Sequence, residues 1–154
     1  MNQIGLNERD AKNLVEKLNE LLSNYHVFYI NIRGYHWNIK GEKFFELHVK
    51  FEELYNNVVL KIDELAERIK TLNETPLHTY TDYLQRSSIK ETRNVSEGKE
   101  CAKNILECLK LLIALQRDIL LESAEINDEG TNALMSDYIR EQEKLVWMYT
   151  AYLS

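Results

Sequence analysis

Four side chains that can bind a metal ion share one flank of an amphipathic segment that runs from Phe44 to Ile69. When this segment is drawn as a helix with 100° per residue and Val58 at zero, its apolar core residues fall within roughly 40° of zero. The four polar side chains fall between about 80° and 180° on the same drawing. They are His48, Glu52, Asp63 and Glu67. This flank is therefore not expected to face the core of the protein.

Imidazole and carboxylate groups suit Fe(II), Zn(II) or Mn(II), and no thiolate lies in reach to favour a structural zinc site. Asp63 and Glu67 are an i, i+4 pair, close enough on one helix to hold a cation together. Two histidines with a few carboxylates would leave coordination positions open for an oxidant. The chemistry that these residue types allow is binding of a divalent metal and its oxidation.

The spacing along the helix adds a constraint, because His48 and Asp63 are separated by about 22 Å along the axis. They cannot bind the same ion within one helix. A twofold axis that pairs two such helices antiparallel would bring the histidine end of one to the carboxylate end of the other, and would make two identical sites. Tyr55 and Val59 lie on or near the same flank. A flank with both ligands and apolar groups indicates a second interface.

Several interpretations of these residues remain open on spacing alone. The Asp63 and Glu67 pair is also typical of a solvated helix face, and Glu67 could pair with Arg68 or Lys70. His36 falls in phase with the apolar stripe of the preceding segment, so a hydrogen-bonded core histidine is an alternative to a ligand.

The elements that must position these side chains are helices. The chain has 154 residues with only five Gly and one Pro, and strand-rich folds need more turn residues than this. Apolar residues recur at the i, i+3, i+4, i+7 spacing of amphipathic helices in four segments. These segments run through residues 11–32, 44–69, 102–120 and 134–153. The length suits a single domain over residues 1–154 with one core.

A long link, Thr71 to Val95, separates the second and third helices, and a short extra helix is expected around Tyr80 to Leu84. One long crossover in a four-helix bundle is the connectivity of ferritin-like folds, so we predict an all-α, ferritin-like four-helix bundle. A short turn at Gly41 predicts that the first two helices are antiparallel neighbours. The expected helix caps are Asn7 with Asp10, Asn94 with Glu97 or else Ser96, and Thr131.

The net charge of −6 suits attraction of cations and argues against strong binding to a phosphate backbone. Cys101 and Cys108 lie about 10 Å apart on one helix, too far for a disulfide, and are expected to be buried thiols. No apolar run approaches the ~20 residues that span a membrane, and no secretory segment is recognisable at the start. We therefore expect a cytoplasmic location.

Several motifs resemble the signature of the Dps miniferritins. They are Arg33-Gly34-Tyr35-His36-Trp37-Asn38-Ile39-Lys40-Gly41, Phe44-Phe45-Glu46-Leu47-His48, Phe51-Glu52-Glu53-Leu54-Tyr55 and Ile62-Asp63-Glu64-Leu65-Ala66-Glu67-Arg68-Ile69. Asp128-Glu129-Gly130-Thr131 and Glu143-Lys144-Leu145-Val146-Trp147-Met148 resemble the last segment of the family. The resemblance covers almost the whole chain, and these elements are specific in this order and spacing.

The resemblance implies a twelve-subunit hollow shell with two iron-oxidation sites at each twofold interface. His36 and His48 would come from one subunit, and Asp63 and Glu67 from its partner. Glu52 would assist a second iron or mineral nucleation. Such sites oxidise Fe(II), with hydrogen peroxide preferred and dioxygen slower, and Fe(III) mineral collects inside the shell. Zinc or another divalent metal can occupy the same ligands.

Further roles follow from the resemblance. Trp37 would pack at the interface or intercept stray oxidant. Acidic pores at threefold axes would admit Fe(II), with Asp128, Glu129 and Asp137 as candidates, although each could instead complement the dipole of a helix N-terminus.

The alternative function is DNA compaction with the shell mainly as a scaffold, which would add nucleoid association. The segment before the first helix has no Lys and the chain ends at Leu153-Ser154, so we do not expect direct DNA binding. A third interpretation is a helical bundle whose flank is only a dimer interface without metal. The Glu-x-x-His pairs of metal sites inside a bundle are not expected, because Lys70 follows Glu67 and Glu125 follows Glu122 at that spacing.

Overall fold

Five helices account for most of the chain in the computed structural model, which describes all residues from 1 to 154. They are α1 (Glu8–Asn38), α2 (Phe44–Thr71), α3 (Tyr80–Arg86), α4 (Gly98–Glu125) and α5 (Glu129–Leu153). The only strand-like pairing is one isolated bridge between Lys40 and Glu97. The all-α prediction is confirmed, including the short helix in the long link.

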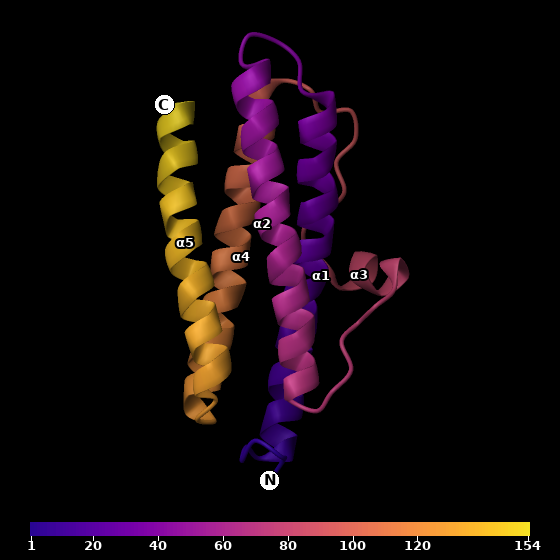
Figure 1. The fold of residues 1–154 in the computed structure, drawn as a ribbon, viewed down its shortest axis with the longest axis vertical. Helices are drawn as coiled ribbons and strands as arrows, with labels where there is room; N and C mark the ends of the chain where they lie inside the picture. The colour runs from indigo at the N-terminus through magenta and orange to yellow at the C-terminus, as the bar shows by residue number, and fades with distance from the viewer.

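The four long helices lie side by side, and α3 stands beside α1 (Figure 1). The short α1–α2 turn contains Gly41 at φ +108°, a conformation that favours glycine, and makes these two helices antiparallel neighbours. The link that carries α3 then returns along the bundle, so α2 and α4 run in the same direction before α5 turns back (Figure 1). This is the crossover connectivity of a ferritin-like bundle.

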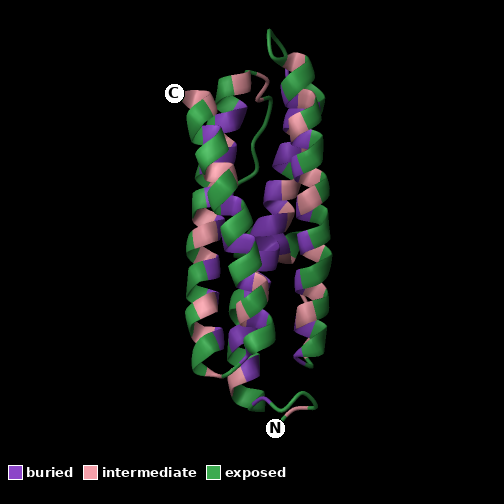
Figure 2. Ribbon diagram, turned by 60° about the vertical axis from the view of Figure 1, so that its left-hand side comes forward, coloured by how far each residue is buried: buried purple, intermediate pink, exposed green.

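The core is built from the apolar stripes of the helices. Buried residues line the inner side of each long helix while exposed residues cover the outer side (Figure 2). Large, fully buried side chains come from α1, α2 and α4. They include Leu14, Leu18, Tyr25, Phe28, Ile32, Phe51, Leu65, Ile69, Ile105 and Leu109. At ~25 cal/mol per Å² of buried apolar area, packing of these stripes is the main favourable term that holds the helices together.

Helix capping agrees with the sequence at one end and differs at two others. Asn7 caps α1 by accepting hydrogen bonds from the backbone N–H groups of Arg9 and Asp10, as predicted. The predicted caps at Asn94 or Ser96 are wrong, because the Glu97 side chain itself caps α4. The predicted cap at Thr131 is also wrong.

Asp128 caps α5 and accepts the backbone N–H of Thr131 at 3.0 Å. Its carboxylate is also held by Arg68 at the end of α2, at 2.6 Å. This contact comes from another helix, and so the local spacing that suggested Thr131 could not reveal it.

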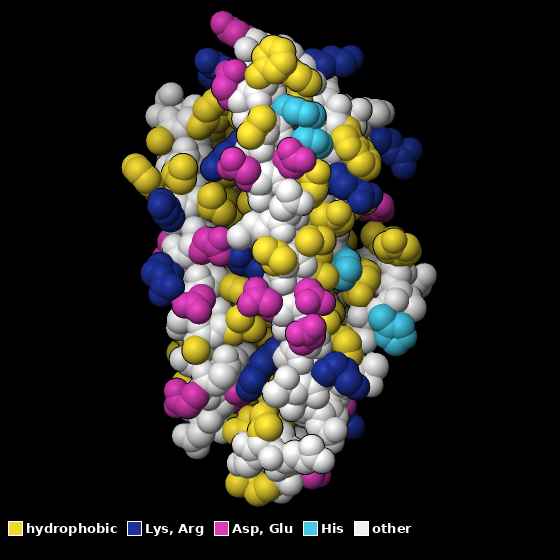
Figure 3. All heavy atoms as spheres, in the orientation of Figure 1, with side chains coloured by type: hydrophobic (Ala, Val, Ile, Leu, Met, Phe, Trp, Pro, Cys, Tyr) yellow, Lys and Arg dark blue, Asp and Glu magenta, His cyan; other side chains and the backbone are white.

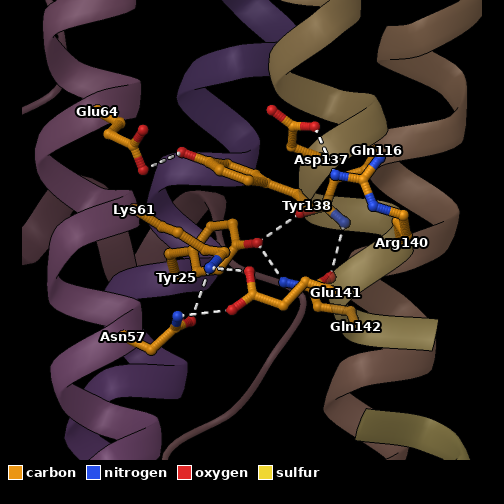
Figure 4. A network of polar contacts seen from close by, with 10 residues as sticks. All are labelled: Tyr25, Asn57, Lys61, Glu64, Gln116, Asp137, Tyr138, Arg140, Glu141 and Gln142. Carbon is orange, nitrogen blue, oxygen red and sulfur yellow. Dashed lines mark hydrogen bonds and ion pairs between the residues drawn. The ribbon is translucent and has the colours of Figure 1, made fainter. Parts of the chain in front are cut away.

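Polar contacts join α2 to α5 along the seam where these helices meet (Figure 4). The buried Lys61 ammonium donates to Asn57 Oδ1 at 2.7 Å and to Glu141 Oε2 at 2.5 Å, and lies 5.1 Å from the centre of the Tyr138 ring. Tyr138 donates its hydroxyl hydrogen to Glu64 at 3.2 Å. Each of these polar groups therefore finds a partner within the chain.

A closed ring of three hydrogen bonds lies next to this seam, inside the bundle (Figure 4). Tyr25 Oη donates to Gln116 Oε1 at 2.5 Å, Gln116 Nε2 donates to Gln142 Oε1 at 2.7 Å, and Gln142 Nε2 donates back to Tyr25 Oη at 2.6 Å. Phenol and amide groups from α1, α4 and α5 thus satisfy one another where a metal site inside the bundle would need carboxylates and histidines.

The two cysteines are free thiols, Cys101 buried and Cys108 half-buried. Burial raises the pKa of the Cys101 thiol to about 12 and that of Cys108 to about 11. Both are therefore protonated at neutral pH and poorly nucleophilic. None of the helices combines the length and the apolar character needed to cross a bilayer.

Candidate metal-binding site

His36 near the end of α1 and His48 near the start of α2 form a stacked pair of imidazole rings. The ring centres are 3.9 Å apart and the planes differ by only 11°. His36 is buried and His48 is half-buried. The turn at Gly41 brings the two residues together, although twelve positions separate them in the sequence.

The two rings fix each other's orientation through their Nδ1 atoms. His36 Nδ1 donates to the backbone carbonyl oxygen of His48 at 2.6 Å, and His48 Nδ1 donates to that of His36 at 2.8 Å. Because a carbonyl only accepts, each Nδ1 carries its proton, and in the neutral ring the Nε2 lone pair is left free. Metal-binding histidines are commonly held in this way, with the non-binding nitrogen donating to a carbonyl.

The end of α1 makes this arrangement possible. The last carbonyl groups of a helix have no partner within the helix. Lys40, four residues after His36, donates its backbone N–H to Ser96 at 2.9 Å instead of continuing the helix. The His36 carbonyl therefore accepts from the His48 ring. His48 acts both as a candidate ligand and as a cap for the C-terminus of α1.

Aromatic residues surround the histidine pair. Phe44 stacks on His48 with ring centres 5.0 Å apart, and Tyr55 meets the His36 ring edge-on at 5.3 Å. Tyr29 in turn contacts Tyr55 at 5.9 Å. These contacts limit rotation of both imidazoles, so the two Nε2 atoms are preorganised.

The three predicted carboxylates on α2, Glu52, Asp63 and Glu67, are exposed, and none forms an ion pair within the chain. Figure 3 looks onto this part of the molecule, where two adjacent histidines lie near one end and acidic side chains lie further along. No three histidine, cysteine or acidic side chains of one chain converge closely enough to hold a metal. The structure thus joins His36 to His48 and leaves Asp63 and Glu67 apart from them.

An apolar groove of about 410 Å³ lies between α2 and α3, over α1. Its lining includes Tyr29, Ile30, Val59 and Tyr83, and side chains such as Ile30 and Val59 are more than 40% exposed. His26 lies in the same groove, stacked on Tyr83 at 3.8 Å. Burial lowers the pKa of His26 to about 4. The flank that carries the candidate ligands is therefore also the flank with exposed apolar surface.

The three pore candidates differ in their surroundings. Asp128 is buried, caps α5 and pairs with Arg68, which is the structural role that the sequence had left open. Glu129 is exposed in the first turn of α5. Asp137 is exposed and pairs with Arg140 at 2.9 Å. Only Glu129 and Asp137 are accessible at the surface of the single chain.

Arg33 is a residue of this flank that the sequence analysis did not single out. Its guanidinium lies 5.2 Å from the centre of the Tyr29 ring and 4.8 Å from that of Trp37. The signal that could have revealed it is the spacing of an arginine between aromatic residues at i−4 and i+4, which places the three side chains on one helix face.

The sequence and the structure are both similar to known proteins. The model of the family described as ferritin-like domain matches residues 15–154. The chain is 57% identical over 148 residues to an uncharacterized protein of Haemophilus influenzae, with 96% of this chain and 92% of the relative covered. It is 39% identical over 148 residues to the DNA protection during starvation protein of Porphyromonas gingivalis, with 96% and 93% covered.

The fold is also similar to that of a solved structure. The fold superposes on the DPS protein of Vibrio cholerae with a TM-score of 0.99 at 53% identity, covering 100% of this chain and 97% of the other. That protein is described as a member of a broad superfamily of ferritin-like diiron-carboxylate proteins.

Proposed function

The chain belongs to the Dps family of ferritin-like proteins, and from this premise we propose that it oxidises Fe(II) at sites shared by two subunits and stores the Fe(III) as mineral in a hollow shell. Membership of this family supports a role in iron handling and stress protection. The shell is expected to contain twelve subunits, and hydrogen peroxide is the expected oxidant.

The observation that carries the proposal is that each chain holds two incomplete halves of a metal site. One half is the His36 and His48 pair with its free Nε2 atoms. The other half is Asp63 with Glu67, one turn apart on α2 and without ion-pair partners. The two halves together have the composition of an oxidising iron site, and separately neither holds enough ligands.

An antiparallel twofold pairing of α2 completes both halves at once. It sets the histidine pair of each subunit opposite the carboxylates of the other, and so makes two sites per interface. The pairing would cross near the middle of α2, where Tyr55 and Val59 lie, and would cover the apolar groove. Closing the groove removes exposed apolar surface, which favours the pairing.

The proposed chemistry uses the protein as a ligand set. Two Fe(II) ions give up one electron each, and one hydrogen peroxide takes both electrons and two protons to form two water molecules. Because the electrons are transferred as a pair, no hydroxyl radical is released. His36 and His48 bind iron through Nε2, Asp63 and Glu67 bind it through carboxylate oxygens, and none needs to act as an acid or base. Glu52 lies one turn from His48 and is the candidate for a second iron.

Transport to the site and competing metals complete the proposal. Glu129 and Asp137 remain the accessible candidates for guiding Fe(II) through acidic pores, whereas Asp128 is buried, pairs with Arg68 and caps α5. Zinc binds the same imidazole and carboxylate ligands, and so would compete with iron.

The test is anaerobic loading with Fe(II) followed by a stoichiometric pulse of hydrogen peroxide, with ferric absorbance as the readout. A His36→Ala, Asp63→Ala double variant is expected to oxidise iron at least about 100-fold more slowly, since its sites lack ligands. The matched control is His78→Ala with Glu53→Ala, which removes an exposed histidine and an exposed acid elsewhere. Equal rates in all three proteins, each still a large assembly, would contradict the proposed site.

Mixing the single variants tests whether the site is shared. Chains with His36→Ala and chains with Asp63→Ala are unfolded together and reassembled. A mixed twofold pair contains one intact site and one site without either ligand, so random mixing restores about a quarter of the sites. Sites built within one chain would give no recovery at all.

A further inference from the structure

Arg33 carries a positive charge that no carboxylate of its own chain neutralises. It forms no ion pair, its Nε is buried without a hydrogen-bond partner, and its only hydrogen bond is a long one of 3.3 Å from Nη1 to Tyr29 Oη. Nevertheless the side chain is half-buried. A guanidinium with this many unused donors on a partly desolvated flank indicates an anionic group that the single chain lacks.

The guanidinium is also held in place. Tyr29 and Trp37 lie one turn before and one turn after Arg33 on α1, and both ring centres are within 5.2 Å of its Cζ. Contact with aromatic rings stabilises the cation and restricts its rotamers. The Trp37 ring packs against Arg33 rather than in the core, which explains why Trp37 is 62% exposed in the single chain.

The unpaired charges on the same flank of α2 have the opposite sign. Asp63 and Glu67 are exposed and form no ion pair in the chain. In the twofold pairing proposed above, they face the end of α1 that carries His36. Arg33 is one turn from His36 toward the middle of α1. The two α2 helices of the proposed pair are antiparallel, and α1 is antiparallel to α2 of its own chain. A step from His36 to Arg33 therefore runs in the same direction as a step from Glu67 to Asp63 of the partner subunit.

We propose that Arg33 is a positioning residue that forms an ion pair with Asp63 of the partner subunit. The inference rests on the proposed function for the apposition of the two half-sites. The pair orients one oxygen of the carboxylate and leaves the other for iron, and it keeps the two half-sites in register before metal binds. Glu91 of the same chain lines the groove with Arg33 and is the competing partner.

The first experiment is a double-mutant cycle on metal-free protein. Subunit dissociation is measured by sedimentation over a dilution series for the wild type, Arg33→Met, Asp63→Asn and the double variant. If each ion pair contributes about tenfold, the two pairs of a twofold interface make Arg33→Met weaken association roughly 100-fold. In the Asp63→Asn background the same substitution is expected to change association less than about twofold. An equal loss in both backgrounds would overturn the pairing.

Further variants keep the test decisive. Glu91→Gln replaces Asp63→Asn in a parallel cycle, and coupling to Arg33 only there would assign the charge to Glu91 instead. Arg33→Asp and Asp63→Arg each place like charges together, whereas the combined variant restores the attraction. Recovery of assembly in the combined variant supports the pair, and failure to recover beyond the single variants overturns it.

Iron oxidation by the wild type is measured independently of these cycles. If the wild type oxidises iron but Arg33 and Asp63 are not coupled, the ion pair is contradicted and the proposed function stands. If the wild type does not oxidise iron but the two residues are clearly coupled, the proposed function is contradicted and the ion pair stands.

Discussion

The two sides of α2 differ in how completely their polar groups are satisfied. On the side toward α5, the side chains of Asn57, Lys61 and Glu64 all have partners on the facing helix or on α2 itself. On the side toward α3, the carboxylates of Asp63 and Glu67 have none. Both sides carry similar chemical groups, and so residue type does not explain the difference.

The paired groups on the side toward α5 stabilise the single chain. The unpaired groups on the side toward α3 are available to a partner subunit or a ligand. A buried polar group without a partner costs about 1–3 kcal/mol, which selects for complete pairing inside a folded chain. On the α5 side, Asn57, Lys61 and Glu64 of α2 meet this requirement within the chain, and the buried atoms left without a partner there are the Tyr149 hydroxyl and one oxygen of Asp128. On the α3 side the Arg33 Nε stays unpaired beside an open apolar groove. This is the pattern expected where an interface and a ligand complete the structure.

The largest predicted effect concerns the side of α2 that faces α5. Glu141→Ala leaves the buried Lys61 ammonium without its carboxylate, and we expect the free energy of unfolding to fall by about 3 kcal/mol. Iron oxidation by the assembled protein should be unchanged, because no candidate ligand lies on that side. Urea unfolding at one fixed protein concentration measures the first effect, and ferric absorbance measures the second.

Glu143→Ala is the matched control for this variant. It removes an exposed carboxylate from the same helix, where the pair with Arg117 is worth at most ~1 kcal/mol. If Glu141→Ala slowed iron oxidation as strongly as loss of a ligand, the proposed division of α2 into two sides would be wrong.

The helices, and the position of the candidate ligands off the core, could be predicted because both depend on local geometry. Four apolar stripes at helical spacing fixed the bundle, and the angular positions of His48, Asp63 and Glu67 on one helix placed them off the core. A rise of 1.5 Å per residue was enough to show that one helix cannot unite them. These arguments need no knowledge of the neighbouring helices.

What could not be predicted depends on contacts between elements. The cap of α5 is Asp128 because Arg68 of α2 holds it there. The His36 carbonyl is available to His48 because the backbone of Lys40 turns away to Ser96 in the crossover link. Such partners are distant in the sequence, and many arrangements of them are compatible with the same apolar pattern.

The second prediction concerns His48, which is a candidate ligand and also stabilises the chain by capping α1. His48→Ala should abolish fast iron oxidation and lower the free energy of unfolding by about 1 kcal/mol, since the His36 carbonyl loses its donor. His48→Asn should abolish oxidation alone, because its amide Nδ2 can take the place of Nδ1. Equal stability of the two variants would show that the cap contributes nothing.

The smallest predicted effect concerns His26, which lies in the apolar groove between α2 and α3. Burial lowers the folded-state pKa of His26 to about 4, below the ordinary value of 6.5. Between these values the unfolded chain binds a proton that the folded chain does not, so stability falls as the pH falls from 6.5 toward 4.

The ring is only partly buried, and we therefore expect a loss of about 1 kcal/mol after allowing for screening by solvent. His26→Phe keeps an aromatic ring against Tyr83 without the titration. The difference in the free energy of unfolding between wild type and His26→Phe should grow in favour of the variant as the solution is acidified. His78→Phe, which changes an exposed histidine outside the groove, is the control variant. A constant difference across this pH range would mean that water reaches His26 in the groove, and the open side of α2 would then be hydrated at that point rather than apolar.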